Sequence, residues 1–234
     1  MTPRGDIAVK VWGEYACFSR PEFKVERVSY PVMTPSAARG VLEAIFWKPE
    51  IRYEIREILV VKMGSQTTVL RNEIGCRQGS KPLLVEDERQ QRTSLILKGV
   101  EYVIHASVRL RPHTRDPLPK YVEQFERRVG RGQCFHQPYF GTREFSAYFE
   151  AATGADRPES VNQTIGTMLF DLAFVRTGDP KKGEMYFLDH SNNVRREVRG
   201  RAHALFFNAE LKDGRLLVPQ EKYQELYALE QASA

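Results

Sequence analysis

Residues 34–62, TPSAARGVLEAIFWKPEIRYEIREILVVK, decide the fold because they pass from a helical pattern to a strand pattern within one short stretch. Thr34 suits the cap of a helix. Pro35 suits its first turn, where the missing N–H group of proline has no intrahelical partner to lose. Apolar residues then recur at the spacing of a single helix face, and Pro49 stops the repeat. The pattern predicts a helix over residues 34–47.

The alternation that follows this helix is typical of a β-strand. Apolar residues stand at every second position from Ile51 to Ile55 with charged residues between them, which predicts a strand over 51–62. The same reasoning predicts further elements on either side, namely strands over 6–18, over 100–111 and near 139–149, and a helix over 117–129.

These elements follow the order β-α-β-β-α-β, which predicts an α+β fold with a ferredoxin-like, RRM-like sheet over residues 1–152. Residues 64–97 carry charges of both signs and several glycines, and we interpret them as a long irregular insertion. Short strand patterns separated by turn signals predict a small antiparallel C-terminal sheet region over 153–234. Its predicted strands lie near 164–176, 183–190 and 202–219.

The composition sets wide limits on function. Lys and Arg number 35 against 30 Asp and Glu, a formal net charge of +5 over 234 residues. This excess allows a polyanionic partner without demanding one. The three cysteines are far apart, so we expect neither a disulfide framework nor a structural zinc site. No apolar run approaches the roughly 20 residues of a membrane span, and the N-terminus lacks a signal-peptide core. We therefore expect a cytoplasmic protein that does not bind membranes.

The segment Arg111–Gln133, RPHTRDPLPKYVEQFERRVGRGQ, joins a predicted strand to the 117–129 helix. Asp116 is placed to cap this helix, and Lys120 and Tyr121 follow in its first turn. Because a helix N-terminus carries free N–H groups and a partial positive charge, this position suits a phosphate, and Lys120 would add a full charge. The segment's candidates for contacting nucleic acid are Arg111, Arg127, Arg128 and Arg131. The alternative is an ordinary amphipathic helix with a solvated lysine.

A second basic run places four arginines within seven residues, Arg195, Arg196, Arg199 and Arg201. Arginine forks match phosphate groups with two hydrogen bonds, so this run is a candidate for gripping a nucleic-acid backbone. The alternative is a charged hairpin edge that protects the sheet from pairing with other chains.

Histidines and the outward sheet face offer weaker signals. None of the five histidines stands at metal-ligand spacing from another histidine or a cysteine, so we expect no metal and no cofactor. His113 and His136 flank the 117–129 helix and are candidates for acid–base chemistry. The outward face of the sheet would carry aromatic and basic groups, as in RNA-recognition domains, unless another segment covers it. These groups are Lys10, Trp12, His105 and Arg109.

The block MTPSAARGVLEAIFWKPEIRYEI, Met33–Ile55, resembles the d variant of the fifth CRISPR-associated protein family, in its subtype I-C (Dvulg) branch. The opening VWGEYACFSRPEFKVERVSYPV, the LRPHT segment and FGTREFSAYF resemble the same family in the same order. The resemblance implies a RAMP-superfamily protein with a ferredoxin-like N-terminal domain. It also implies a metal-independent endoribonuclease that cuts the repeat hairpin of precursor crRNA and keeps the 5′ handle. Its implied partners are the backbone and large subunits of a Cascade complex, with double-stranded DNA as a further candidate.

The family pattern has a tyrosine before Trp-Lys-Pro and a Lys-His pair at the second helix. This chain has Phe46 at the first position and Lys120 followed by Tyr121 at the second, so of these groups it keeps the lysine. Phe46 is chemically inert, so either Tyr121, His113 or His136 acts as the base, or the activity is weaker than is usual for the family. Two functions stay open: an endoribonuclease that uses 2′-hydroxyl attack, and a non-catalytic RNA- or DNA-binding subunit of the same complex.

Overall fold

The computed structural model describes residues 5–23, 25–76, 79, 82–177, 185–189 and 196–231, without the side chains of Asp189 and Arg196. Their strands form one mostly antiparallel sheet, and a few helices accompany it, so the α+β class is confirmed. The strands are β1 (Gly5–Ala16), β2 (Arg27–Val28), β3 (Ile51–Lys62), β4 (Ser65–Ile74), β5 (Arg89–Leu110), β6 (Tyr148–Ala151), β7 (Gln163–Arg176), β8 (Met185–Asp189), β9 (Arg196–Lys212) and β10 (Arg215–Leu217). The helices are α1 (Pro35–Ile45), α2 (Val85–Glu88), α3 (Leu118–Gly130) and α4 (Lys222–Gln231).

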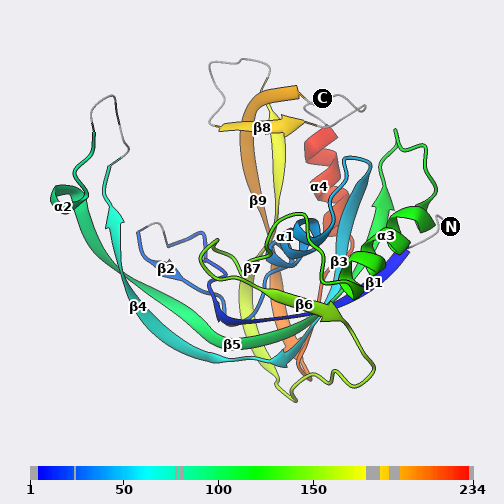
Figure 1. The fold of residues 1–234 in the computed structure, drawn as a ribbon, viewed down its shortest axis with the longest axis horizontal. Helices are drawn as coiled ribbons and strands as arrows, with labels where there is room; N and C mark the ends of the chain where they lie inside the picture. Colours follow the sequence, from blue (N-terminus) through cyan, green and yellow to red (C-terminus); the bar gives the residue numbers. More distant parts are fainter. Residues whose placement is uncertain are drawn as a thin grey trace.

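The strands pair in the order β6-β1-β5-β3-β10-β9-β7, while β2 and β4 add to β5 and β8 adds to β9. In Figure 1, α1 lies near the middle of the molecule, α3 lies at its right-hand side near β1, and α4 runs beside the C-terminal strands. Because β10 pairs with β3, the C-terminal strands continue the sheet that β1, β3 and β5 begin. The division of the chain at residue 152 stays a prediction.

Helix α1 forms for the reasons visible in the sequence. The Thr34 side chain accepts a hydrogen bond from the Ala37 N–H at 3.2 Å, and Pro35 occupies the first turn. The buried face of the helix includes Val41, Leu42 and Ile45, and it packs on β3 and β7. The predicted helix and the predicted strand over 51–62 are therefore both confirmed.

The interpretation of residues 64–97 as irregular is wrong. Strand β4 pairs with the first half of β5 in an unbroken antiparallel ladder from Ser65 opposite Lys98 to Ile74 opposite Arg89. This hairpin arm curves away from the body of the protein, with α2 at its far end (Figure 1). The side chains of β4 alternate between exposed and half-buried, so neither face is apolar enough to show the alternation of a core strand.

The predicted strand near 139–149 is shorter and later than expected, since β6 begins at Tyr148. Residues before it form a loop closed by a bridge between Tyr139 and Ser146. Gly141 in this loop has a φ of +82°, and a Cβ atom there would collide with the carbonyl oxygen of Cys17. The loop therefore packs directly on the backbone that follows β1, which an extended strand could not do.

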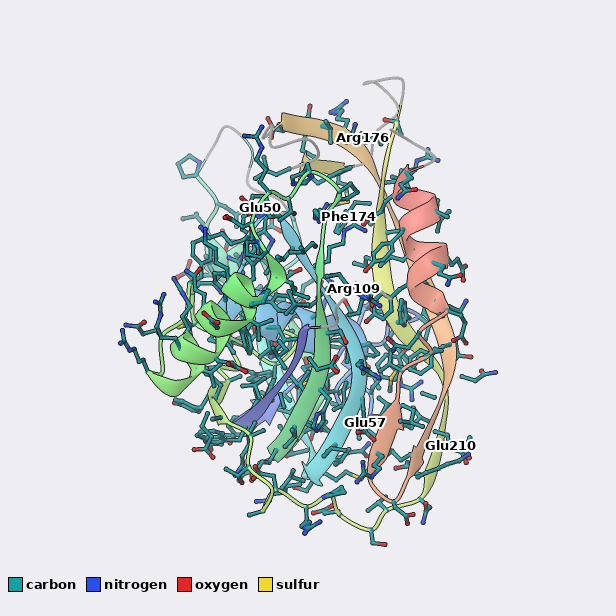
Figure 2. The ribbon with its side chains drawn as sticks, turned by 90° about the vertical axis from the view of Figure 1, so that its right-hand side faces the viewer. Glu50, Glu57, Arg109, Phe174, Arg176 and Glu210 are labelled. Atoms are coloured by element: carbon teal, nitrogen blue, oxygen red, sulfur yellow. The ribbon has the colours of Figure 1, made fainter. Side chains whose placement is uncertain are left out.

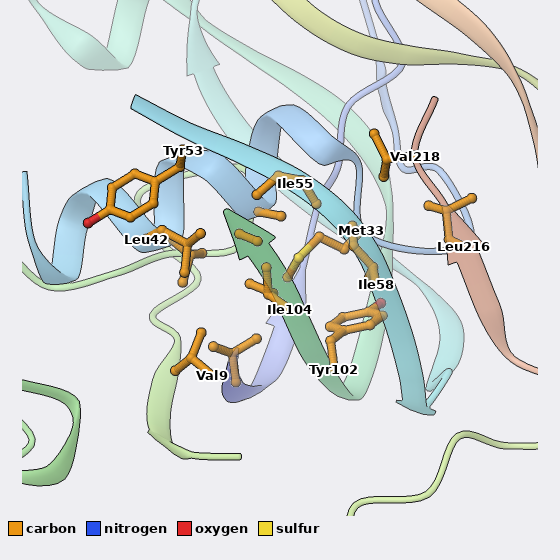
Figure 3. Close-up of a cluster of buried hydrophobic side chains, with 14 of the residues drawn as sticks. Val9, Met33, Leu42, Tyr53, Ile55, Ile58, Tyr102, Ile104, Leu216 and Val218 are labelled. Atoms are coloured by element: carbon orange, nitrogen blue, oxygen red, sulfur yellow. The ribbon is translucent and has the colours of Figure 1, made fainter. Parts of the chain in front are cut away.

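One hydrophobic core runs through the sheet and beneath the C-terminal elements. Ile55 and Ile58 of β3 lie in the same cluster as Leu216 and Val218, which follow more than 150 residues later (Figure 3). The sequence did not predict α4, whose buried residues are Tyr223 and Leu226. No helix of the described residues is both long and apolar enough to cross a bilayer.

Candidate functional site

Phe46 ends helix α1 and belongs to the core, with 2% of its surface exposed. The Tyr53 hydroxyl donates to the Phe46 carbonyl oxygen at 2.6 Å. Arg128 of α3 lies over the Phe46 ring, 5.6 Å from its centre, and donates to the Ile45 carbonyl oxygen at 3.2 Å. Arg128, a candidate for nucleic-acid contact, is thus engaged in closing the end of α1.

The start of α3 differs from the sequence prediction at its cap. Pro117 is the cap residue and no side chain bonds to the helix there, so the expected Asp116 cap is wrong. The Asp116 carboxylate instead pairs with the Lys120 ammonium at 2.7 Å. Both side chains are about half exposed, at 49% and 56%, so Lys120 lies in the first turn on an open surface. An anion would have to compete with Asp116 for this lysine.

Tyr121 lies on the buried face of α3, with 4% of its surface exposed. The buried stripe of this helix consists of Leu118, Tyr121, Phe125 and Val129, so Tyr121 contributes to packing. Burial raises the pKa of the Tyr121 phenol, and the charges of Glu50 and Asp116 raise it further. The phenol is therefore protonated at neutral pH and can donate a hydrogen bond.

The loops at the ends of β3 and β5 hold a cluster that includes a residue absent from the sequence predictions. The Glu50 carbonyl oxygen accepts from the Arg111 N–H at 2.8 Å and from the Thr114 hydroxyl at 2.7 Å. Three buried side-chain atoms in these loops have no hydrogen-bond partner within the described residues: Glu50 Oε2, Arg111 Nε and His113 Nε2. Glu50 gave no local signal, because it reads as one more charged residue after Pro49.

The structure separates the predicted catalytic positions into two groups. Lys120 and Arg128 are eight positions apart in α3, which at the rise of an α-helix is about 12 Å. Tyr121 interacts with the charge of Glu50, so Lys120, Tyr121 and the Glu50 loop lie around the start of α3. Phe46 lies at the other end, beside Arg128.

The second basic run, Arg195–Arg201, is described only in part. Arg195 lies outside the described residues, and the Arg196 side chain is also undescribed. The Arg199 guanidinium lies over the Tyr186 ring at 4.5 Å, while Arg201 is exposed. Because side chains alternate along a strand, Arg199 and Arg201 share a face of β9. On α3 and just after it, Arg127 and Arg131 are exposed.

The outward face of the sheet is not a basic platform. Lys10 pairs with Glu101, Glu150 and Asp156 at 2.8–3.3 Å, and Arg109 pairs with Glu54 at 2.8 Å. On the same strand, Ser107 is buried and its hydroxyl donates to Asp6 at 2.7 Å. Leu110, the last residue of β5, is 39% exposed.

After α3 the chain carries an aromatic cluster that the sequence reading missed. Phe135 is 69% exposed, and its ring centre lies 5.7 Å from that of His136. The His136 ring stacks on Tyr139 at 6.5 Å. No three of His, Cys, Asp or Glu gather as a metal site would require in the part of the chain that the structure describes.

Comparison with known proteins gives a consistent result. A family model described as CRISPR-associated protein (Cas_Cas5) matches residues 6–219. A protein of Thermus thermophilus named CRISPR pre-crRNA endoribonuclease Cas5d is 60% identical over 97% of both chains. One of the same name from Mannheimia succiniciproducens is 38% identical over 91% of this chain and 94% of its own. A solved structure titled as a CRISPR-associated protein superposes with a TM-score of 0.61 at 20% identity, covering 93% of both chains. The solved structure of a functionally uncharacterized protein of Streptococcus mutans superposes with a TM-score of 0.60 at 19% identity. The match covers 93% of this chain and 94% of that one.

Proposed function

Because the chain belongs to the d variant of the CRISPR-associated Cas5 family, we propose that it is an endoribonuclease that cleaves precursor crRNA in the repeat. The observation that carries this proposal is the 60% identity to a pre-crRNA endoribonuclease over 97% of both chains. The proposal is supported by the retained Lys120, which is exposed in the first turn of α3.

The reaction is an internal transfer at phosphorus that needs no metal. The 2′-hydroxyl of one nucleotide loses its proton to a base and attacks the adjacent phosphorus, and the bond to the 5′ oxygen breaks. The upstream product then carries a 2′,3′-cyclic phosphate, and the downstream product carries a 5′-hydroxyl after its oxygen takes up a proton. Lys120 stabilises the negative charge that develops on the phosphate, and the free N–H groups of the helix start favour the same charge.

Tyr121 and His113 divide the remaining roles. The raised pKa of Tyr121 makes this residue a poor base and a suitable donor to the phosphate or to the leaving oxygen. His113 is the proposed base, because a neutral imidazole nitrogen can accept the proton of the 2′-hydroxyl. Its buried Nε2 atom lies in the loop that hydrogen-bonds to Glu50, which supports an oriented ring. His136 is the second candidate base, in the exposed aromatic cluster.

The basic residues supply binding. Arg127 and Arg131 at the end of α3 and Arg199 and Arg201 on β9 contact the RNA backbone in this proposal, together with Arg195 and Arg196. The partners are the repeat hairpin and its retained 5′ handle, and the backbone and large subunits of a cytoplasmic Cascade complex. Double-stranded DNA is a further candidate ligand of the same arginines.

The pairing order supports a ferredoxin-like arrangement of the N-terminal region. Strands β6-β1-β5-β3 neighbour one another in that order, and α1 and α3 make the two crossovers. We propose residues 1–152 as this domain, with the β4–β5 arm as its insertion and residues 153–234 as a C-terminal β-region.

A second function is favoured by one observation. Phe46 stands where the family pattern has tyrosine, and its ring is buried beneath Arg128, so it offers no proton to a reaction. A subunit that binds the 5′ handle without cutting would tolerate this substitution.

One experiment separates the two functions. The purified protein is incubated with its cognate repeat RNA in excess EDTA, and the product ends are identified. We expect one cut that leaves a 2′,3′-cyclic phosphate upstream and a 5′-hydroxyl downstream. Tight binding without any cut would favour the non-catalytic subunit, and a cut that needs added magnesium would refute the mechanism.

A further inference from the structure

A cavity of about 220 Å³ is lined by elements from distant parts of the chain. Its lining includes Trp47 after α1, Arg52 on β3, Arg111 after β5, Phe174 on β7 and Leu188 on β8. Tyr227 of α4 completes the wall. Figure 2 shows Phe174 on β7, in the half of the molecule where α4 runs alongside that strand.

The charges of this lining balance. Among the described residues, three arginines and three carboxylates contribute to it. Arg39 takes up two of the carboxylates, since it bonds to Asp171 at 2.7 and 2.8 Å and to Glu43 at 2.8 and 2.9 Å. Arg52 pairs with Glu230 at 2.9 Å. A phosphate would therefore enter a cavity that offers no net positive charge.

Arg111 differs from Arg39 and Arg52, because one of its donors lacks a hydrogen-bond partner among the described residues. Its Nε atom is buried, and no described residue accepts a hydrogen bond from it. Burial lowers the pKa of Arg111, and the neighbouring charge of Arg52 lowers it further. A buried donor without a partner is costly, so the cavity lacks an acceptor at this place. The carboxylates of the lining are already bonded to Arg39 and Arg52.

From this lining we infer that the cavity binds one unpaired base of the RNA and selects guanine. The inference rests on the proposed RNA-processing function and adds a base-specific site to it. An arginine matches the O6 and N7 atoms of guanine with two hydrogen bonds, since both are acceptors. Adenine offers N7 beside a donating amino group, which Arg111 cannot satisfy because arginine has no acceptor. Trp47 and Phe174 supply the aromatic surface on which extruded RNA bases stack.

The test measures binding of short RNAs that have no hairpin. The protein is titrated against labelled UUGUU and UUAUU, and against UUGUU with 7-deazaguanine, which lacks the N7 acceptor. We expect UUGUU to bind roughly 5- to 150-fold more tightly than UUAUU, the range of one bidentate arginine–guanine contact. The 7-deazaguanine RNA should lose most of this advantage. Arg111→Gln should remove it as well, whereas Arg157→Gln, which removes an exposed arginine of the β6–β7 loop, should keep it.

The outcomes separate this site from the cleavage reaction. Equal binding of the three RNAs by the unaltered protein would overturn the inference, whether or not Arg111→Gln folds. Displacement of all three RNAs alike by millimolar inorganic phosphate would also overturn it and assign the cavity to a phosphate. Cleavage of repeat RNA is assayed separately. A guanine preference in a protein that never cuts would keep the cavity and refute the endoribonuclease.

Discussion

Two ion pairs with the same helical spacing serve different purposes in this protein. In α1, Arg39 pairs with Glu43 four residues later, and the Asp171 carboxylate of β7 closes on the same guanidinium. At the start of α3, Lys120 pairs with Asp116 four residues earlier, and both side chains are about half exposed. Burial opposes the charge of Arg39, yet Asp171 and Glu43 raise the pKa of this residue above its ordinary value.

The difference lies in the third partner. Arg39 joins α1 to a strand that follows more than 120 residues later, so its charge stabilises the contact between the two elements. Among the described residues, Asp116 is the one group that pairs with Lys120, and this exposed pair is of the kind that contributes little to stability. Sequence spacing alone cannot distinguish these cases, because the closing carboxylate comes from a distant segment. Removing partners one at a time should therefore change stability in the first region and activity in the second.

The largest expected effect is on stability at Asp171. This side chain is 2% exposed and holds Arg39 through two hydrogen bonds, so Asp171→Ala leaves a largely buried guanidinium without its main counter-charge. We expect the free energy of unfolding to fall by about 3 kcal/mol, the low end for breaking a buried pair, because Arg39 keeps Glu43. Urea denaturation measures the change. Glu22→Ala, which breaks an exposed pair with Arg20, is the control and should change stability by less than about 1 kcal/mol.

Lys120→Ala should slow cleavage strongly and change stability little, the opposite of Asp171→Ala. Loss of one preorganised donor to a developing charge slows a reaction by about 100- to 1000-fold, while removal of an exposed lysine leaves stability nearly unchanged. Single-turnover cleavage of repeat RNA measures the rate, and filter binding should show that affinity persists. Lys222→Ala on α4 is the control, because Lys222 is likewise paired with a nearby carboxylate. The Lys222→Ala protein should cleave the RNA at the parental rate. A Lys120→Ala protein that also cuts at the parental rate would place the active site elsewhere.

Local signals carried much of the fold prediction. The limits of α1 and β3 follow from Thr34, Pro35, Pro49 and a strict alternation, all of which act within a few residues. The β4–β5 arm escaped prediction because neither of its faces is fully buried, so it shows no alternation between core and solvent. Helix α4 escaped because its anchor is a tertiary contact: the Arg52 guanidinium lies 4.4 Å from the centre of the Tyr227 ring.

The site was predictable to a smaller degree. The position of Lys120 in the first turn of α3 was predicted because it depends only on where a helix starts. The burial of Tyr121 and the contacts of Arg128 were not predicted, since both depend on how α3 packs against the end of α1 and β3. The cavity around Arg111 could not be found at all from the sequence, because its lining comes from six segments that are far apart in the chain.

Tyr121→Phe tests whether a buried residue beside Lys120 also acts in the reaction. The change keeps the ring in the stripe of α3 and removes only the hydroxyl group, so stability should change little. A hydrogen bond to a charged group contributes about 1.5–3 kcal/mol, so the cleavage rate should fall roughly 10- to 100-fold. Single-turnover kinetics at saturating protein measures it. A parental rate would assign the donor role to another group and leave Tyr121 as packing.

The arginines of β9 should affect binding rather than chemistry. If Arg199 and Arg201 each contact a phosphate, replacing both with alanine should reduce the salt slope of single-stranded RNA binding by about 1.4, at 0.7 for each contact. Titrations over a series of salt concentrations give the slope. Replacing the exposed Arg143 and Arg157 removes equal charge and should leave the slope as it was. An unchanged slope in the β9 variant would mean that these arginines only protect the sheet edge.

The smallest expected effect sharpens the comparison most, because it removes the partner and keeps the lysine. Asp116→Asn frees Lys120 from the pair at 2.7 Å that a phosphate must displace. Since an exposed pair is worth at most about 1 kcal/mol, cleavage should become faster by no more than about 5-fold. Salt screens exposed charges, so the gain should shrink as ionic strength rises. In α1 the corresponding change, Glu43→Gln, should lower stability without raising any activity. A slower Asp116→Asn enzyme would show instead that Asp116 holds Lys120 in its working position, which would make the two pairs alike.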